Sequence, residues 1–480
     1  MKVWLPILTA FCLFPPSISL WAAPPAFPGA EGFGAAASGG RGGRVVFVTN
    51  TQPDGLGSLQ WALDQPSPKY VLFRTSGVID ARIHLRRGDV TIAGQTSPGG
   101  ITVRGFVTDE TPFQDQEVRA PGQHAENWIL RHIRIRPGAD GPSDDGLRLR
   151  YTRRAIVDHV SVGNATDEAV EISYANGVTI QNCILAETIG SHAFYGGMLM
   201  NYSNPGHGFA LDRISVHHNA FVRLQGRLPE VSRESLAAAG STMRLEISCN
   251  LYWDPSFFIA LGADTNVVTD RNGNPYPLHF RLNAVNNVFR PRIRFPFGMW
   301  DDAILRAPES AARNYLHVRG NRLMTEATRR DYALFHCCND FRTTGTENSA
   351  RLATALPRRH AFPRISYTPA SALRSRLVAR AGAFPRDPMD RRLMESVHRD
   401  RIAAARTDLN PSGDALETAY LGAPPAPPTD RDNDGMPDGW EQSRGLDPSV
   451  PDHNGLVLSA AGYTNLEVYL AEIGEQRVAE

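Results

Sequence analysis

One phrase recurs along the middle of this chain: a short run of β-branched and apolar residues that ends in asparagine. These asparagines stand 31 to 37 residues apart. A period of this length is typical of a solenoid in which each repeat makes one coil. Equivalent residues of successive coils stack, so an asparagine at one corner can hydrogen-bond its neighbours and satisfy backbone groups. The phrase therefore predicts an all-β fold, a right-handed parallel β-helix, rather than a β-sandwich with asparagines in ordinary turns. The asparagines are Asn182, Asn219, Asn250, Asn287 and Asn321.

The segments on either side of the repeats predict a cap and a small C-terminal unit. Residues 57–65, with the sequence GSLQWALDQ, predict an N-terminal capping helix that begins near Ser58. Helical period and charge pairing predict a further helix over 387–406. The predicted divisions are a β-helix domain at 24–376, a helical extension at 377–422, a stiff proline-rich linker at 423–429 and a helical, calcium-loop unit at 430–480.

Residues 1–23 predict an export signal. Lys2 precedes the mostly apolar stretch Val3–Phe14, and the small pair Ala22-Ala23 offers a cleavage site. The stretch is too short to span a bilayer and is broken by Pro15-Pro16. We therefore expect a secreted protein, extracellular or periplasmic.

The balance of charges bears on the kind of partner. The chain has 50 lysines and arginines against 50 acidic residues, so no net field attracts nucleic acid or an anionic membrane. Only Lys2 and Lys69 are lysines, and arginine is the better residue for planar, bidentate binding of carboxylates. We expect a monomer that holds an acidic partner in a local site and binds neither nucleic acid nor a membrane.

A calcium-binding pattern opens the C-terminal unit. Residues 430–441 match the twelve-residue loop D-x-D-x-D-G-x5-E, in which the glycine permits a sharp turn. The linker precedes the loop where a full EF-hand would have a helix. We expect a calcium ion in a structural role here, against the alternative of an acidic linker. The predicted ligands are the carboxylates of Asp430, Asp432, Asp434 and Glu441, the backbone carbonyl of Met436, and Asp438 directly or through water.

A second group of acids lies within the predicted β-helix. Alternation along a strand puts Asp167 and Glu171 on one side of the sheet. If the preceding coil stacks directly beneath, Asp145 comes within reach and completes an oxygen-rich calcium site. On spacing alone, a solvated strand face explains these acids equally well.

Several phrases together resemble the secreted pectate lyases of polysaccharide lyase family 1. They are AFPGAEGFGAAASGGRGG, TIAGQTSPGG, DHVSV with DE nine residues on, HHN followed by GRLPE, and DNDGMPDGWE and GYTNLEVYL in the tail. The resemblance covers roughly residues 26–325 and 429–470. It implies a parallel β-helix that cleaves polygalacturonate (pectate) by β-elimination, with calcium held between carboxylates of the protein and of the substrate.

Carried onto this sequence, the resemblance places the calcium acids on Asp145, Asp167 and Glu171, and the catalytic arginine on Arg227. The chemistry is consistent, because a cation on the sugar carboxylate stabilises the charge that develops when the neighbouring carbon loses its proton. The family is usually described with arginine as the base, whereas arginine ordinarily stays protonated. Two alternatives follow: a depressed pKa of Arg227, or a water or hydroxide base beside a charge-stabilising Arg227.

The substrate contacts depart from the family pattern. A lysine and a second arginine that familiar members use are replaced by Ser173 and Ser232. The rival functions are a noncatalytic β-helix that binds polysaccharide, a lyase for another polyuronate, and a hydrolase with paired carboxylates. The candidates for binding substrate in place of the missing cations are Arg223, Arg233, His192 and His207.

Overall fold

The computed structural model describes residues 23–109, 124–138, 144–189, 196–224, 226–232, 238, 240–255, 260–261, 279–292, 314–334, 354–402 and 422–479. The predicted export signal, apart from its last residue, lies outside these ranges, as do the substrate candidates Arg233 and His192. Among the residues described, no helix combines the length and the apolar character needed to cross a bilayer.

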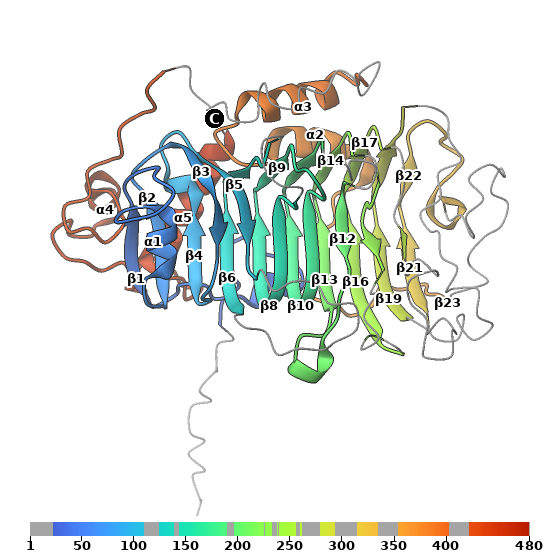
Figure 1. The fold of residues 1–480 in the computed structure, drawn as a ribbon, viewed down its shortest axis with the longest axis horizontal. Coiled ribbons are helices and arrows are strands. Elements are labelled where there is room, and N and C mark those ends of the chain that lie inside the picture. The colour runs from blue at the N-terminus through green and yellow to red at the C-terminus, as the bar shows by residue number, and fades with distance from the viewer. Residues whose placement is uncertain are drawn as a thin grey trace, which may run out of the picture.

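The strands form a parallel β-helix, as the repeats predict (Figure 1). Strand β10 (Val170–Gln181) pairs in parallel with β8 (Leu147–Asp158), which lies 23 residues earlier in the chain (Val170 opposite Leu147). On its other side it pairs in parallel with β13 (Asp212–His217), 36 residues later (Asn176 opposite Asp212). Each coil therefore stacks directly on the previous one, and the side chains that point inward form one continuous apolar core.

The strands of each coil contribute to three faces, which we name A, B and C. Strands β8 and β10 bend from face A into face B, whereas β3 and β5 bend from face C into face A. Face A holds the second halves of β3 (Gly77–His84) and β5 (Ile101–Val107), the first halves of β8 and β10, then β12 (Met198–Met200), β15 (Glu230–Val231) and β18 (Ala260–Leu261).

The remaining strands and half-strands form faces B and C. Face B holds β1 (Arg44–Val48), β2 (Lys69–Phe73), β4 (Val90–Ala93), β6 (Ala125–Arg131), the second halves of β8 and β10, β13, β16 (Thr242–Ser248), β19 (His279–Val285), β21 (Tyr315–Arg319) and β23 (Thr354–Ala355). Face C holds the first halves of β3 and β5, then β7 (Ile133–Ile135), β9 (Ser161–Gly163), β11 (Ile184–Ala186), β14 (Ala220–Val222), β17 (Leu251–Trp253), β20 (Val288–Arg290) and β22 (Arg322–Leu323).

An asparagine ladder runs along the corner between faces B and C. The backbone N–H of Asn219 donates to Asn250 Oδ1 at 3.0 Å, and the N–H of Asn250 donates to Asn287 Oδ1 at 3.0 Å. In the same way, the N–H of Asn287 donates to Asn321 Oδ1 at 3.0 Å. These three bonds confirm four of the five predicted ladder residues.

The prediction that Asn182 is the fifth ladder residue is wrong by one position. Cys183 takes that rung, and its N–H donates to Asn219 Oδ1 at 2.9 Å. Asn182 instead has a positive φ of 53°, like Asn286 (56°), which immediately precedes a ladder residue. Its side chain turns to the previous coil and donates to Asp158 Oδ1 at 3.0 Å.

The capping helix is confirmed. Helix α1 (Leu59–Asp64) begins after Ser58, whose hydroxyl accepts a hydrogen bond from the N–H of Trp61 at 3.1 Å. Short 3-10 helices occur at η1 (Phe33–Ala36), η2 (Gly94–Thr96), η3 (Pro205–His207) and η7 (Asp331–Leu334).

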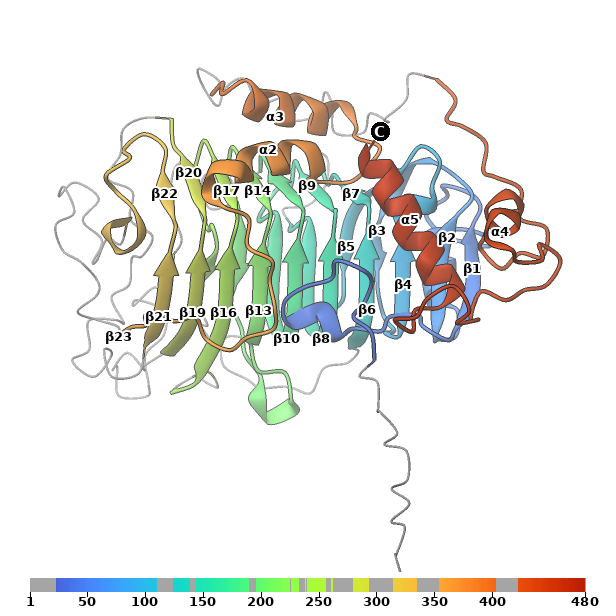
Figure 2. The ribbon, with the colours of Figure 1, turned by 180° about the vertical axis from the view of Figure 1, so that it is seen from behind.

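Two helices of the extension cover the outside of face C (Figures 1 and 2). Helix α2 (Ala370–Arg380) runs across the boundary placed at 376, so that boundary does not coincide with the end of an element. Helix α3 (Pro388–His398) occupies the first part of the helix expected over 387–406, of which 403–406 lie outside the described residues. Leu373 of α2 and Leu393 of α3 pack in one apolar cluster with residues of β11, β14 and β17.

The C-terminal unit packs on the outside of face B at the first coils (Figure 2). It contains α4 (Asp438–Arg444) and α5 (Asn465–Ala479). The two helices pack together, since the ring of Trp440 in α4 lies 5.1 Å from that of Tyr469 in α5, centroid to centroid.

Candidate functional site

The candidate site lies on the turns that lead from face C to face A. Asp144 and Asp145 precede β8, Asp167 and Glu168 precede β10, and Arg227 precedes β15. Since these turns stack like the strands they join, residues about one coil apart in sequence come together. The N–H of Glu168 accordingly donates to Asp145 Oδ1 at 3.2 Å.

Three carboxylates converge there. One oxygen from each of Asp145, Asp167 and Glu168 lies within 4.8 Å of the others. Burial and then the nearby carboxylate of Glu171 hold the pKa of Asp145 well above its usual value. Burial also raises the pKa of Glu168 to about 7, with Asp167 adding to the shift and Arg227 opposing it. Crowded negative charge removed from water suits a bound cation.

Glu171, expected as the third acid of this site, is not among the three acids whose oxygens converge, and Glu168 is. The Glu171 carboxylate accepts from Arg150 Nη2 at 2.7 Å, Arg148 Nε at 3.0 Å and Ser173 Oγ at 2.7 Å. Although burial opposes the shift, these partners, Arg150 foremost, lower the pKa of Glu171 to about 2.

The register of the strands explains the position of Glu171. Arg148 stands directly opposite Glu171, and Arg150 opposite Ser173, on the outward side of face A. Strand β10 begins only at Val170, so the alternation that places Glu171 does not extend back to Asp167. The sequence contains a signal for the two arginines, because alternation in LRLR, residues 147–150, points both of them outward.

Arg148 is a cation within the acid group. Its guanidinium hydrogen-bonds Asp144, lies 2.8 Å from Asp145 Oδ2 through Nη2, and donates to Glu171 through Nε. Arg82 of β3 forms an ion pair with Asp144 from the other side. The acids nearest Arg148 are thus partly neutralised, whereas Glu168 pairs with Arg227 of the next turn.

Arg227 faces the acids, as expected. It has a φ of 53° in its turn, its Nη1 hydrogen-bonds Glu168 Oε1, and its Nε lies 3.2 Å from Glu230 Oε2. Burial works against its charge, but Glu168 and Glu230 outweigh burial and raise the pKa of Arg227. Its guanidinium is therefore a permanent cation beside the acid cluster.

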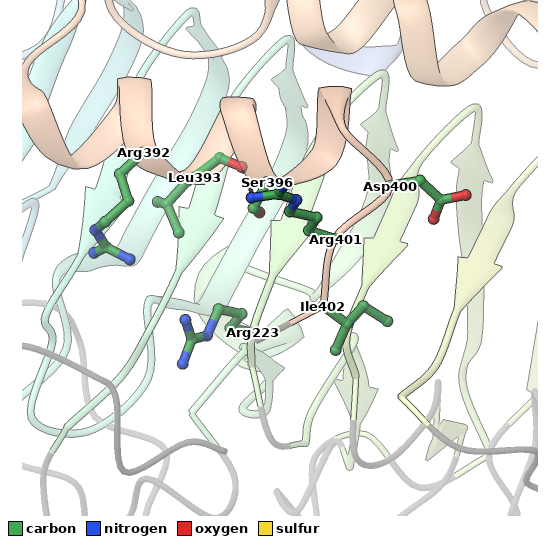
Figure 3. Close-up of a pocket in the computed structure, with 7 residues that line it drawn as sticks. All are labelled: Arg223, Arg392, Leu393, Ser396, Asp400, Arg401 and Ile402. Atoms are coloured by element: carbon green, nitrogen blue, oxygen red, sulfur yellow. Dashed lines mark hydrogen bonds between the residues drawn. The ribbon is translucent and has the colours of Figure 1, made fainter. Parts of the chain in front are cut away.

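Two substrate candidates lie elsewhere. Arg223 lines a separate cavity of about 580 Å³ beneath α3, shared with Arg392 (Figure 3). Both arginines pair with Glu187, at 3.3 Å and 2.7 Å respectively. His207 is exposed on η3, which joins face A to face B at the edge opposite the acid cluster, and its Nδ1 is 3.0 Å from Asn204 Oδ1.

The C-terminal loop gathers a second set of acids. Asp430, Asp432 and Asp434 form one group with oxygens within 4.8 Å, and Asp434 also groups with Glu441 and Asp452. Burial, and then the neighbouring carboxylates, raise the pKa of Glu441 to about 8.

Asp438, one of the ligands expected in this loop, has another contact. It belongs to neither group, since its carboxylate accepts from the N–H of Arg431 at 2.8 Å. Met436, whose backbone carbonyl is the expected ligand, buries its side chain in the apolar cluster that contains Leu72, and its N–H donates to Asp434 Oδ1 at 3.0 Å. Asp452 lies outside the twelve-residue pattern, so a search for that pattern does not find it.

Comparison with known proteins gives full-length relatives, although no family model matches the chain. "Probable pectate lyase C" of Aspergillus oryzae is 30% identical over 468 residues, which cover 92% of this chain and 93% of that protein. The Aspergillus fumigatus protein of the same name is 29% identical over 487 residues, 98% of each chain. The chain is also similar to a solved pectate lyase of Bacillus sp. N165 in complex with trigalacturonate, with 14% identity, a TM-score of 0.42, and coverage of 74% of this chain and 99% of that one. On the full-length similarity to these relatives, the chain belongs to the pectate lyase family.

Proposed function

We propose that this chain is a secreted, calcium-dependent lyase that cleaves pectate by β-elimination. The observation that carries the proposal is the meeting of Asp145, Asp167 and Glu168 with Arg227 on stacked turns. Membership of the pectate lyase family supports it, and so does the export pattern of residues 1–23, because a plant cell-wall polymer lies outside the cell that degrades it.

The acid cluster fits a calcium ion. Carboxylate oxygens are the ligands that calcium prefers, and it accepts six to eight of them in flexible geometry. Asp145, Asp167 and Glu168 would hold the ion, and substrate carboxylates and water would complete its shell. A bound calcium ion would stabilise the negative charge that develops on the sugar carboxylate during elimination.

Arg227 supports the reaction as a charged donor. Its pairing with Glu168 and Glu230 and the high ordinary pKa of a guanidinium favour the second of the two alternatives, in which arginine stays protonated. The guanidinium then offers donors to the developing enolate-like charge, while water or hydroxide takes the proton from the carbon beside the carboxylate. The glycosidic oxygen leaves from the adjacent carbon, which creates an unsaturated sugar end.

Arg150 supplies positive charge where the family lysine is missing. Ser173 occupies that position here, and Arg150 stands directly opposite it on the neighbouring strand. Arg150 is bound to Glu171, which fixes its guanidinium on the outward side of face A. A cation therefore remains beside the acid cluster despite the substitution.

The test is the ultraviolet absorbance of the unsaturated product, measured with polygalacturonate in the presence of calcium and again after chelation. A calcium-dependent rise on pectate supports the proposal. A rise only on methylated pectin or alginate would identify a lyase for another polymer, and reducing ends without the chromophore would identify a hydrolase. Binding of polysaccharide without formation of either product would identify a noncatalytic β-helix.

A further inference from the structure

The C-terminal unit buries carboxylate oxygens that have no hydrogen-bond partner among the described residues. They are Asp430 Oδ1, Asp432 Oδ2 and both side-chain oxygens of Glu441. Glu441 is fully buried, with 0% of its surface exposed. A buried polar atom without a partner is costly, and a buried carboxylate is more so. These oxygens therefore point to a ligand that satisfies them.

The arrangement of the free oxygens suits one calcium ion. Single oxygens come from Asp430 and Asp432, and a pair comes from Glu441, which is the pattern of an EF-hand-type loop with a bidentate final glutamate. Asp434 and Asp452 bring further carboxylates into the same space. The N–H of Asp452 donates to Asp434 Oδ2 at 3.0 Å, which holds the segment beyond α4 against the loop.

The same loop is fastened to the first coils of the β-helix. Arg74, just after β2, donates to Asp430 Oδ2 and to Asn433 Oδ1, each at 2.9 Å. The sharp turn at Gly435 has a φ of 95°, and a Cβ added there would come within 2.5 Å of Leu72 Cδ1. Met436 is fully buried in the apolar cluster that contains Tyr70, Leu72 and Ala93 of face B. The loop thus covers apolar side chains that would otherwise lie on the outer surface of the first strands.

We propose that Asp430, Asp432, Asp434, Glu441 and Asp452 bind one calcium ion, separate from the catalytic cluster, which locks the C-terminal unit onto strands β2 and β4. Asp452 takes the ligand role that the loop pattern gives to Asp438. Without the ion, five carboxylates repel one another in a partly buried space, and the loop loses its fit over Leu72. Calcium in this site consequently governs whether the apolar side of the first strands is covered.

The test measures calcium binding and local protection in the full-length chain. Terbium luminescence sensitised by Trp440, next to Glu441 in sequence, reports occupation of this loop, and calcium titration displaces the terbium. We expect Glu441→Gln and Asp452→Asn each to weaken calcium binding by at least about tenfold. Asp438→Asn is the matched control and keeps the affinity of the parent. Asp167→Asn, in the catalytic cluster, leaves the terbium signal unchanged, so this result is independent of the lyase activity.

Hydrogen exchange tests the lock. Chelation of the parent protein is expected to increase the exchange rate of β2 and β4 by at least about tenfold while β13 and β16 stay protected. Equal affinity in Asp452→Asn and Asp438→Asn would overturn the ligand assignment. Calcium binding that leaves exchange in β2 and β4 unchanged would overturn the lock. If Glu441→Gln fails to fold, Asp452→Asn and chelation of the parent still decide both points.

Discussion

Glu168 and Glu171 stand three residues apart, and exchanging each for glutamine should have opposite consequences. Glu171 accepts hydrogen bonds from two arginines and a serine, and its pKa falls from the usual 4.5 to about 2. At 1.36 kcal/mol per unit, this shift corresponds to roughly 3 kcal/mol of stabilisation at neutral pH. Because the folded-state pKa is depressed, the stabilisation is present above about pH 4.5 and disappears as the pH falls toward 2.

Glu171→Gln should therefore lower the free energy of unfolding by roughly 3 kcal/mol at pH 7, and should leave the calcium requirement of the lyase reaction near that of the parent. Glu168→Gln should do the reverse. Its carboxylate already has a raised pKa, so neutralising it costs little stability, but it removes a calcium ligand and should raise the calcium concentration for half-maximal activity by at least about tenfold.

Urea denaturation at pH 7 gives the stabilities, and the rate of unsaturated product formation against free calcium gives the metal requirement. Both assays use calcium well above the needs of the C-terminal loop, so that the lock stays closed. If Glu171→Gln raised the calcium requirement as much as Glu168→Gln did while costing little stability, the assignment of Glu168 as the ligand would be refuted.

Two further predictions concern the β-helix itself. Asn250→Ala removes the Oδ1 that accepts from Asn219 and the Nδ2 that donates to Val216 O and Asn287 Oδ1, which leaves buried groups unsatisfied. It should cost about 3 kcal/mol by urea denaturation, against less than half of that for Asn182→Ala, which loses the bond to Asp158. Equal costs would contradict the ladder. Burial lowers the pKa of His217 from 6.5 to about 4. Between these pH values the imidazole is protonated in the unfolded chain but not in the folded one, so the free energy of unfolding should fall by up to roughly 3 kcal/mol as the pH drops from about 6.5 to 4. His217→Gln should flatten that part of the stability profile, and an unchanged profile would assign the acid sensitivity to other groups.

The fold could be predicted from the sequence because its main signal repeats. A single strand-then-asparagine phrase is ambiguous, but several at similar spacing are compatible with few architectures other than stacked coils. The error of one residue at Asn182 has a local cause. Asparagine is favoured both on the ladder and in the left-handed position just before it, as Asn286 and Asn287 show side by side. Spacing cannot distinguish the two positions.

The site could be predicted in part. Asp145, Asp167 and Arg227 lie on stacked turns, and stacking follows from the repeat. Strand alternation and the family resemblance both point to Glu171, but alternation does not hold for Asp167 and Glu168, which precede β10, where the turn decides the direction of each side chain. Asp452 could not be found because its segment approaches the loop only through the fold of the C-terminal unit.

The most direct test of the central claim is the rate of ultraviolet absorbance increase with polygalacturonate and calcium for the parent protein and for Arg227→Lys. The matched control is Arg244→Lys, another arginine paired with a carboxylate, that of Asp212 on face B. We expect a rise for the parent and for Arg244→Lys, and none for Arg227→Lys at any calcium concentration, since lysine keeps the charge but loses the planar fork of donors. Activity retained by Arg227→Lys would remove Arg227 from the reaction and contradict the site proposed for this chain.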